Sequence, residues 1–298
     1  MCLTRGRLNT VSQFAPAKLN LFLAVTGRRA DGFHDLVSVA VPLNWGDRLE
    51  AELAAATTLQ SDDLELPLGE SNLVLKAAAA FRAATGWEKG VAFRLTKRIP
   101  MGAGLGGGSS DAVAALLAMN KLAGDPLGSA DLLALAARLG ADCALFLGGE
   151  PVIMRGKGEQ LERMEAAVTA RLRGRRVFIF KPGFGVSTPW AYGRMIARPE
   201  TYLPAAEAEA RLRQWRESDA PVENLLYNNM ETVVFAKYPA LPALYDTLRE
   251  RFGLAARMSG SGSASFAFLP EGANLPGIES CVRDAWGPTA FTITAQVA

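Results

Sequence analysis

A glycine-rich segment constrains this chain more than any other feature. It reads Pro100-Met-Gly-Ala-Gly-Leu-Gly-Gly-Gly-Ser-Ser110, with glycine at positions 102, 104, 106, 107 and 108. Glycine permits a positive φ and lets the backbone approach a bulky group closely. The segment leads into a predicted helix, whose unpaired N–H groups and positive dipole end attract anions. We therefore expect a phosphate-binding loop, because the alternative of a flexible linker fits poorly between a strand and a buried helix.

Three common nucleotide-binding motifs do not describe this loop. Gly102, Gly104 and Gly107 satisfy the G-x-G-x-x-G spacing of dinucleotide-binding folds. However, the preceding strand is half polar, and the acidic residue at the expected distance, Asp125, falls between two predicted helices. A Walker A loop requires a lysine before Ser109, and protein kinases require HRD and DFG elements. The sequence contains none of these.

Length and charge narrow the class of protein. A chain of 298 residues exceeds the usual size of a single core, which favours two domains. The densest basic cluster, residues 171–176, is interpreted as the connector, so we expect a nucleotide-binding domain at 1–170 and a second domain at 171–298. The net charge of +2 is too small to predict binding to a nucleic acid.

The cysteines and the single histidine exclude several kinds of disulfide and metal site. Cys2, Cys143 and Cys281 have no CxxC spacing, so they predict neither a disulfide framework nor a zinc site. His34 is the single histidine, which excludes a multi-histidine metal site. We find no signal peptide, and no apolar run reaches the roughly 20 residues that span a bilayer. We therefore expect a cytoplasmic protein with no membrane partner.

Hydrophobic periodicity predicts a mixed fold. Alternation indicates strands at 17–25, 37–41, 91–95, 177–180 and 266–269, and a buried apolar run suggests another at 143–147. Helices are expected at 71–84, 111–123, 129–139, 205–217 and 241–252, with Ser109 or Ser110 capping the second of these. Helices and strands do not alternate strictly, which favours an α+β fold.

Three motifs in a fixed order resemble the GHMP kinases, a family of small-molecule kinases. The central motif P-x-x-x-G-L-x-x-S-S is carried by Pro100, Gly104, Leu105, Ser109 and Ser110, with one additional glycine. The others are Ala15-Pro-Ala-Lys-Leu-Asn-Leu21 and Met258-Ser-Gly-Ser-Gly-Ser263. The resemblance implies two domains with the active site in the cleft between them, and ATP with Mg²⁺ as cofactors. It assigns nucleotide binding to Pro100, Met101, Gly102, Ala103, Gly104, Leu105, Gly106, Gly107, Gly108, Ser109 and Ser110.

Two further segments, Gly27-Arg-Arg-Ala-Asp-Gly-Phe-His34 and Gly140-Ala-Asp142, narrow the resemblance. They are similar to the branch of the family that uses ATP to phosphorylate the 2-hydroxyl of a cytidine-diphosphate-linked sugar alcohol. That reaction belongs to the non-mevalonate route to isoprenoid precursors. The resemblance implies that Asp142 and Lys18 are catalytic and that the substrate is held by Asn20, Phe33, His34 and Tyr192. The loop at 259–263 is expected to approach the substrate or the nucleotide phosphates, and its alternative interpretation is a mobile hairpin.

The catalytic pair has a physical rationale of its own. Phosphoryl transfer requires the positioning of two substrates and the neutralisation of charge, with a base for the attacking hydroxyl. Asp142 is the candidate base, although an aspartate after a glycine can also be a turn or cap residue. A lysine nearby would keep that carboxylate ionised, whereas an ordinary lysine reaches solvent. Asn20 shares the strand face of Lys18, because successive side chains alternate.

The aromatic candidates are compatible with stacking on a cytosine base. Phe33 stands where the family commonly has tyrosine, and Tyr192 is preferred over Trp190 as the second ring. Core packing is the alternative for each. Mg²⁺ keeps several waters and few protein ligands, so the sequence leaves its ligands open, with Ser110 and Asp142 as candidates. Another GHMP enzyme and a non-catalytic nucleotide sensor are the competing functions, and the chain is expected to be a monomer or homodimer.

Overall fold

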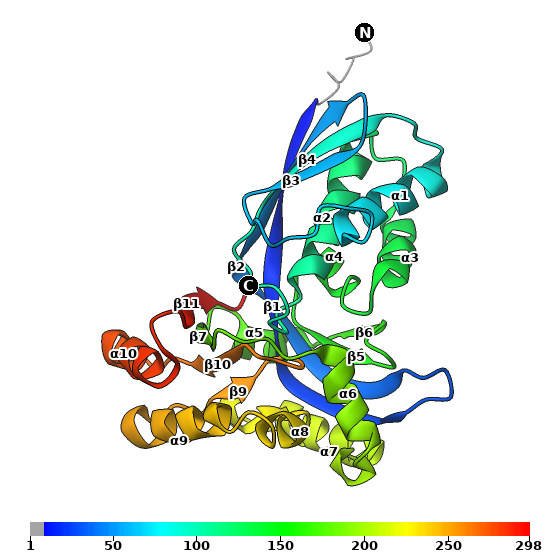
Figure 1. Cartoon of the computed structure of the whole chain (residues 1–298). Helices are drawn as coiled ribbons and strands as arrows, with labels where there is room; N and C mark the ends of the chain where they lie inside the picture. Colours follow the sequence, from blue (N-terminus) through cyan, green and yellow to red (C-terminus); the bar gives the residue numbers. More distant parts are fainter. Residues whose placement is uncertain (1–8) are drawn as a thin grey trace. The chain divides into compact units, whose positions relative to one another are not determined.

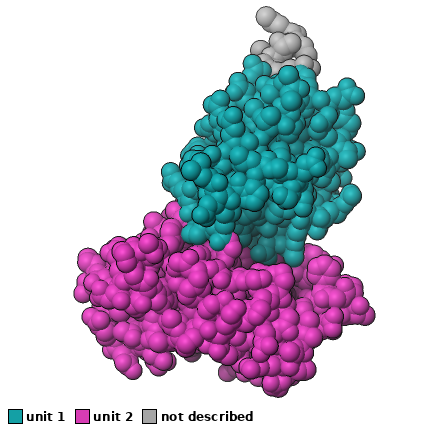
Figure 2. Space-filling view, in the orientation of Figure 1, with its two compact units in different colours: residues 1–17, 46–101, 106–149 teal, residues 18–45, 102–105, 150–298 magenta. Residues whose placement is uncertain are grey.

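The computed structural model describes residues 9–298, which form two compact units (Figure 2). Unit 1 contains residues 9–17, 46–101 and 106–149, and unit 2 contains residues 18–45, 102–105 and 150–298. The long strands β1 (Thr10–Arg28) and β2 (His34–Ala54) each contribute to both units. The domain boundary that we expect at residues 170 and 171 remains a prediction.

Unit 1 packs helices against strands in the order β3-β4-β2-β1 (Figure 1). Strand β4 (Gly90–Thr96) pairs antiparallel with β2, which places Leu49 opposite Leu95, and β3 (Thr58–Ser61) runs parallel to β4. Helices α1 (Leu73–Thr85), α2 (Gly107–Leu122) and α3 (Ser129–Leu139) contact one another, with α1 also against β3 and α2 against β4. The short helix α4 (Leu145–Gly148) packs against α2.

Helix α2 lies at the centre of unit 1. Residues 110–116 and 118–120 are all buried, which agrees with a sequence that is apolar almost all round. The helix begins at Gly107, four residues earlier than we expected, so Ser109 and Ser110 lie within its first turn and do not cap it. The three glycines before Ser109 are therefore divided between the loop and the helix itself.

Unit 2 contains two groups of strands. The first has the order β8-β1-β2, with β5 (Val152–Arg155) pairing with β2 and with β6 (Gln160–Arg163). The second is a four-stranded sheet in the order β11-β7-β10-β9. Its strands are β7 (Arg176–Lys181), β9 (Arg257–Met258), β10 (Ser265–Phe268) and β11 (Phe291–Gln296), while β8 is Tyr227–Asn228.

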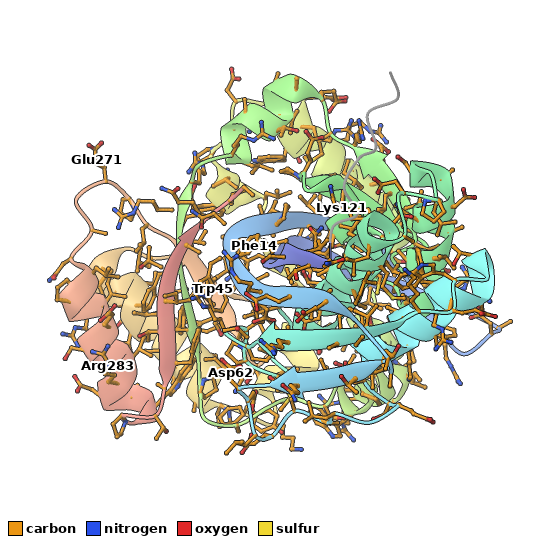
Figure 3. The ribbon with its side chains drawn as sticks, turned by 90° about the horizontal axis from the view of Figure 1, so that it is seen from above. Phe14, Trp45, Asp62, Lys121, Glu271 and Arg283 are labelled. Carbon is orange, nitrogen blue, oxygen red and sulfur yellow. The ribbon has the colours of Figure 1, made fainter. Side chains whose placement is uncertain are left out.

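The helices of unit 2 complete its cores. They are α5 (Ala166–Leu172), α6 (Thr188–Ile196), α7 (Ala205–Arg216), α8 (Glu231–Phe235), α9 (Ala240–Phe252) and α10 (Leu275–Trp286), with 3₁₀ turns at Pro199–Thr201 and Val222–Asn224. Phe178 and Phe180 of β7 pack against buried residues of α9 and α10, so these helices cover one face of the four-stranded sheet. Trp45 lies beside β11, with its ring centroid 5.7 Å from that of Phe291 (Figure 3).

The secondary structure confirms the α+β class and most of the predicted elements. The prediction of a strand at 143–147 was wrong, because this segment forms a turn followed by α4. A short apolar run fits a buried helix as well as a buried strand, so periodicity does not separate the two. Cys143 and Cys281 are buried free thiols, and Cys2 lies outside the described residues. Across residues 9–298, no helix combines the length and the apolarity needed to cross a membrane.

Candidate active site

Lys18 and Asn20 lie on one face of β1 and contact each other. The Lys18 ammonium donates a hydrogen bond to Asn20 Oδ1, and both residues are about as buried as the core, with 4% and 5% exposure. Asn20 Nδ2 in turn donates to Ser38 Oγ at 2.8 Å, and Ser38 donates to the Phe22 carbonyl at 2.7 Å. The lysine that might have reached solvent is therefore held inside unit 2 by a polar network.

The three family motifs converge in unit 2. The backbone N–H of Lys18 donates to the Leu105 carbonyl at 2.9 Å, which joins the first motif to the glycine loop. Ser259 Oγ donates to the Gly104 carbonyl at 3.0 Å and accepts from the Asn20 N–H at 3.3 Å. Segments far apart in the sequence thus form one hydrogen-bonded assembly around residues 103–105.

Gly104 shows why this contact requires glycine. Its φ is +77°, and a Cβ placed there would lie 2.1 Å from the carbonyl oxygen of Ser259. Any other residue would combine an unfavourable backbone conformation with a clash against main-chain atoms, which cannot move aside as a flexible side chain can. The glycine at this position therefore permits the close approach of the two loops.

Asn228 is a buried residue that sequence reasoning missed. Its Nδ2 donates to the carbonyls of Met258 and Gly260, each at 2.8 Å, and its Oδ1 accepts from the Met230 N–H at 3.0 Å. These bonds fix the loop that carries Ser259. The sequence offers no signal for this role, because nothing in the pattern around a single asparagine on a two-residue strand indicates partners about 30 positions away.

The N-terminus of α2 presents groups suited to an anion. Gly106, the N-cap residue, has φ +74° and offers no side chain, so no side chain caps the first turn. Ser110 Oγ is buried, and within residues 9–298 it has no hydrogen-bond partner. Free N–H groups and an orphan hydroxyl fit bound phosphate, and the hydroxyl oxygen also fits Mg²⁺. The described residues contain no group of three or more histidine, cysteine or acidic side chains that could hold a metal ion.

A buried charged cluster anchors both ends of the glycine loop within unit 1. We call Asp47, Lys97 and Asp111 the Lys97 cluster; their side chains are 0%, 5% and 3% exposed. Lys97 Nζ contacts Asp47 and lies 2.9 Å from Asp111 Oδ2, and Asp111 is the fifth residue of α2. Asp47 Oδ1 also accepts the N–H groups of Arg98 and Ile99, at 2.5 and 2.8 Å. Sequence reasoning missed all three side chains.

Asp142 lies in the turn between α3 and α4 and is half-buried. The neighbouring turn residues pack against the start of α2, since a Cβ at Gly140 would lie 3.4 Å from Cys143 Sγ and 3.9 Å from Ser109 Oγ. Burial raises the pKa of the Cys143 thiol to about 11, while a hydrogen bond from Ser109 opposes the shift and the charge of Asp142 adds to it. Asp142 and Ser109 therefore both influence Cys143. The pairing of Asp142 with Lys18 remains a prediction.

The predicted cytosine-binding residues form a second group in unit 2. The rings of His34 and Tyr192 stack, with centroids 4.4 Å apart and an interplanar angle of 27°. Phe33 is 58% exposed, and the Lys157 ammonium lies 4.4 Å from its ring centroid. Tyr202, which the sequence did not single out, places its hydroxyl 3.1 Å from His34 Nε2. We call His34, Tyr192 and Tyr202 the His34 cluster.

The imidazole of His34 stays neutral more readily than that of a free histidine. Burial lowers the pKa of His34, and the positive charge of Arg28 lowers it further. Burial raises the pKa of the Tyr202 hydroxyl. The contact therefore joins a neutral imidazole to a neutral phenol, which suits hydrogen bonding to an uncharged base.

Comparisons with known proteins identify the family of this chain. The GHMP kinases N terminal domain matches residues 72–150, and the GHMP kinases C terminal domain matches residues 206–288. The 4-diphosphocytidyl-2-C-methyl-D-erythritol kinase of Methylacidiphilum infernorum is 39% identical over 266 residues, covering 88% of this chain and 87% of the relative. The protein of the same name from Chlorobium phaeobacteroides is 41% identical over 262 residues, covering 88% and 90%.

Two solved structures are similar to this chain, one in sequence and fold and the other in fold alone. A crystal structure of 4-(cytidine 5'-diphospho)-2C-methyl-D-erythritol kinase has a TM-score of 0.76 and 36% identity, covering 97% of this chain and all of the other. The Methanococcus jannaschii mevalonate kinase, at 13% identity and a TM-score of 0.72 with 99% of each chain covered, shares the fold. The chain therefore belongs to the GHMP kinases, within the family of the 4-diphosphocytidyl-2-C-methyl-D-erythritol kinases.

Proposed function

We propose that this kinase transfers the γ-phosphoryl group of ATP to the 2-hydroxyl of 4-diphosphocytidyl-2-C-methyl-D-erythritol, a step in the non-mevalonate route to isoprenoid precursors. The observation that carries the proposal is the convergence of three distant motifs, at Lys18, Gly104 and Ser259, on one hydrogen-bonded assembly. A protein that only bound nucleotide would need the glycine loop but not the buried Lys18–Asn20 pair.

In the proposed site, the nucleotide is bound mainly by backbone groups. The first turn of α2, which lacks a side-chain cap, would donate N–H groups to the ATP phosphates. Ser110 Oγ is placed to contact a phosphate or Mg²⁺, and Asp142 is the other candidate metal contact. Mg²⁺, when bound with ATP, neutralises charge on the phosphates. Residues 100–110 as a whole are assigned to the nucleotide.

The acceptor end rests on side chains. We assign Asp142 as the base that receives the proton of the attacking hydroxyl. We assign Lys18 as the cation that favours the ionised base and the developing alkoxide. Asn20, held by Lys18 and Ser38, would orient a polar group of the substrate. Phe33, His34 and Tyr192 would hold the cytosine, with stacking from the phenyl and phenol rings and hydrogen bonds from the imidazole.

An Asp142→Asn variant tests the proposed mechanism. The amide keeps the shape of the carboxylate but cannot accept a proton, so kcat should fall roughly 10²- to 10⁴-fold. A coupled assay that follows ADP formation with the purified diphosphocytidyl substrate measures this loss. ATP binding, measured by calorimetry, should be unchanged. Asp131→Asn, which alters an exposed aspartate of α3 in the same unit, is the matched control.

Two results would contradict the proposal. An Asp142→Asn enzyme with wild-type kcat would remove Asp142 from the mechanism. Wild-type turnover of another alcohol, without turnover of the diphosphocytidyl compound, would assign the chain to a different substrate within the GHMP kinases. A cytoplasmic location and assembly as a monomer or homodimer remain predictions.

A further inference from the structure

We propose that Tyr202 is a specificity-determining positioning residue, whose hydroxyl holds His34 so that its Nδ1–H faces the pyrimidine and favours cytosine over uracil. The inference rests on the proposed function, since it assumes that His34 meets the base of a cytidyl substrate. It concerns a residue outside the three motifs, on the segment between the 3₁₀ turn Pro199–Thr201 and α7.

The orientation of His34 is fixed from two sides. Tyr192 stacks on one face of the imidazole, which restricts its plane. Tyr202 occupies Nε2 at 3.1 Å, and within residues 9–298 the ring makes no other hydrogen bond. With only 8% of the residue exposed, the ring has little freedom to turn. Nδ1 is therefore the nitrogen left to contact a ligand.

Tyr202 is itself rigidly held on both sides along the chain. The N–H of Leu203 donates to the Val25 carbonyl at 3.1 Å, and Asn229 Nδ2 donates to the Thr201 carbonyl at 3.0 Å. Asn229 is 4% exposed and also bonds both the N–H and the carbonyl of Val25, at 2.9 and 2.8 Å. The main chain around Tyr202 is thus fastened to β1, and its hydroxyl has a fixed place.

The chemistry of the two partners determines which nitrogen carries the proton. A phenol donates more strongly than it accepts, because its lone pair is delocalised into the ring. The unprotonated nitrogen of a neutral imidazole is a good acceptor. The Tyr202 hydroxyl therefore donates to Nε2, and the single proton of the neutral ring is placed on Nδ1, since the bond made by one nitrogen sets the state of the other.

An N–H at Nδ1 distinguishes the two pyrimidines. Cytosine presents an acceptor at N3, so it can receive this proton there. Uracil presents an N–H at position 3, where two donors would meet and one would remain unpaired. A site built to hydrogen-bond one pattern discriminates against the other because its buried polar group loses its partner.

The enzyme has one histidine, which permits a direct measurement of the tautomer. With ¹⁵N-labelled histidine, a long-range ¹H–¹⁵N spectrum of the full chain contains the signals of His34 alone. We expect the wild type to show the Nδ1–H form and Tyr202→Phe to shift toward the Nε2–H form. A wild-type spectrum dominated by Nε2–H would overturn the inference, whatever the substrate proves to be.

Kinetics supply the second arm of the test. Loss of one hydrogen bond in Tyr202→Phe should raise KM for the diphosphocytidyl substrate about three- to tenfold. The kcat and the KM for ATP should stay within about twofold of the wild type. The preference in kcat/KM for this substrate over its diphosphouridyl analogue should fall by a similar factor. Tyr238→Phe is the matched control, because Tyr238 stacks on Phe184 in the same unit without contacting His34.

The outcomes separate this inference from the proposed function. Unchanged KM and pyrimidine preference in a folded Tyr202→Phe enzyme would overturn the role of Tyr202 while the function stands. A variant that loses kcat and leaves the preference intact would indicate a merely structural role. A wild type that does not turn over the cytidyl substrate would overturn the function, and the pyrimidine selection with it.

Discussion

The Lys97 cluster and the His34 cluster differ in the interactions that hold them together and in the group that each one fixes. The Lys97 cluster is ionic: one lysine contacts two carboxylates, and all three side chains are at most 5% exposed. The His34 cluster is neutral and aromatic, with a ring stack at 4.4 Å and one hydrogen bond at 3.1 Å. The first anchors main chain, whereas the second orients a single ring.

The difference follows from what each cluster must hold. A loop with five glycines at 102, 104, 106, 107 and 108 lacks side chains to fix its own shape, so the residues flanking it must do so. The N–H groups of Arg98 and Ile99 donate charge-assisted hydrogen bonds to Asp47, and these bonds fix the chain before the loop. For the uncharged cytosine that we propose as the ligand of the His34 cluster, neutral donors and acceptors meet the need without burying a charge.

The largest effect that separates the clusters is expected for Asp47→Ala. The change removes a buried partner of Lys97 and the acceptor of two main-chain N–H groups. Breaking a buried ion pair costs about 3–5 kcal/mol, so the free energy of unfolding should fall by that order. Urea denaturation at constant pH measures it. Where the variant remains folded, KM for ATP should rise while KM for the cytidyl substrate changes little.

Asp62→Ala is the matched control for this variant. Asp62 accepts the N–H of Lys97 at 2.8 Å but is exposed, so water can replace the lost carboxylate. A loss of only about 1 kcal/mol is expected. Equal losses for the two variants would refute the view that burial of charge, more than hydrogen bonding to the segment, anchors the loop.

The sequence predicted those helices and strands whose signals lie within a few residues of each other along the chain. Helices such as α3 and α9 were found nearly to the residue, because caps, glycine stops and periodicity act within a few positions. The glycine loop and the shared face of Lys18 and Asn20 were also predictable, since a strand alternates its side chains. The segment at 143–147 failed because its short apolar run has no period that separates strand from helix.

The residues that sequence reasoning missed are those whose partners are distant. Tyr202 contacts His34 across 168 positions, and Asp47 bonds the Ile99 N–H across 52. A tyrosine before a helix or an aspartate after a glycine has many ordinary roles, and nothing nearby marks these as special. Only the fold brings them to their partners, so single-sequence patterns could not have identified either residue.

An intermediate effect is expected when the ring of Tyr192, which we propose stacks on the cytosine base, is removed. Tyr192→Leu keeps apolar volume but loses the aromatic face, and stacking on a base contributes about 1–3 kcal/mol. KM for the diphosphocytidyl substrate should therefore rise about tenfold or more, with KM for ATP unchanged. Steady-state kinetics on both substrates measures this separation.

Trp190→Leu serves as the matched control on the same helix. Trp190 packs edge-on against Tyr238, with Lys237 over its ring, and not against His34. Its substitution should leave KM for the cytidyl substrate close to that of the wild type. If Trp190→Leu raised this KM more than Tyr192→Leu did, Trp190 would replace Tyr192 as the ring that meets the base.

The pH dependence of stability should also distinguish the Lys97 cluster. Burial and the nearby charge of Asp47 together raise the pKa of Asp111 to about 7, despite the opposing charge of Lys97. The folded state therefore retains a proton that the unfolded chain, with an ordinary value of 3.8, has already lost. Raising the pH through this window favours the unfolded state, so this group makes the wild type less stable as the pH approaches 7.

Asp111→Asn should remove that dependence, because the amide mimics the protonated acid at every pH. The melting temperature of the variant, relative to the wild type, should rise between about pH 4 and pH 7 and then level off. Glu231, whose pKa burial also raises to about 7, leaves a residual slope in both proteins that cancels in the difference. Scanning calorimetry across this range measures the difference. A difference that is constant with pH would mean that Asp111 ionises in the folded state as readily as in the unfolded chain.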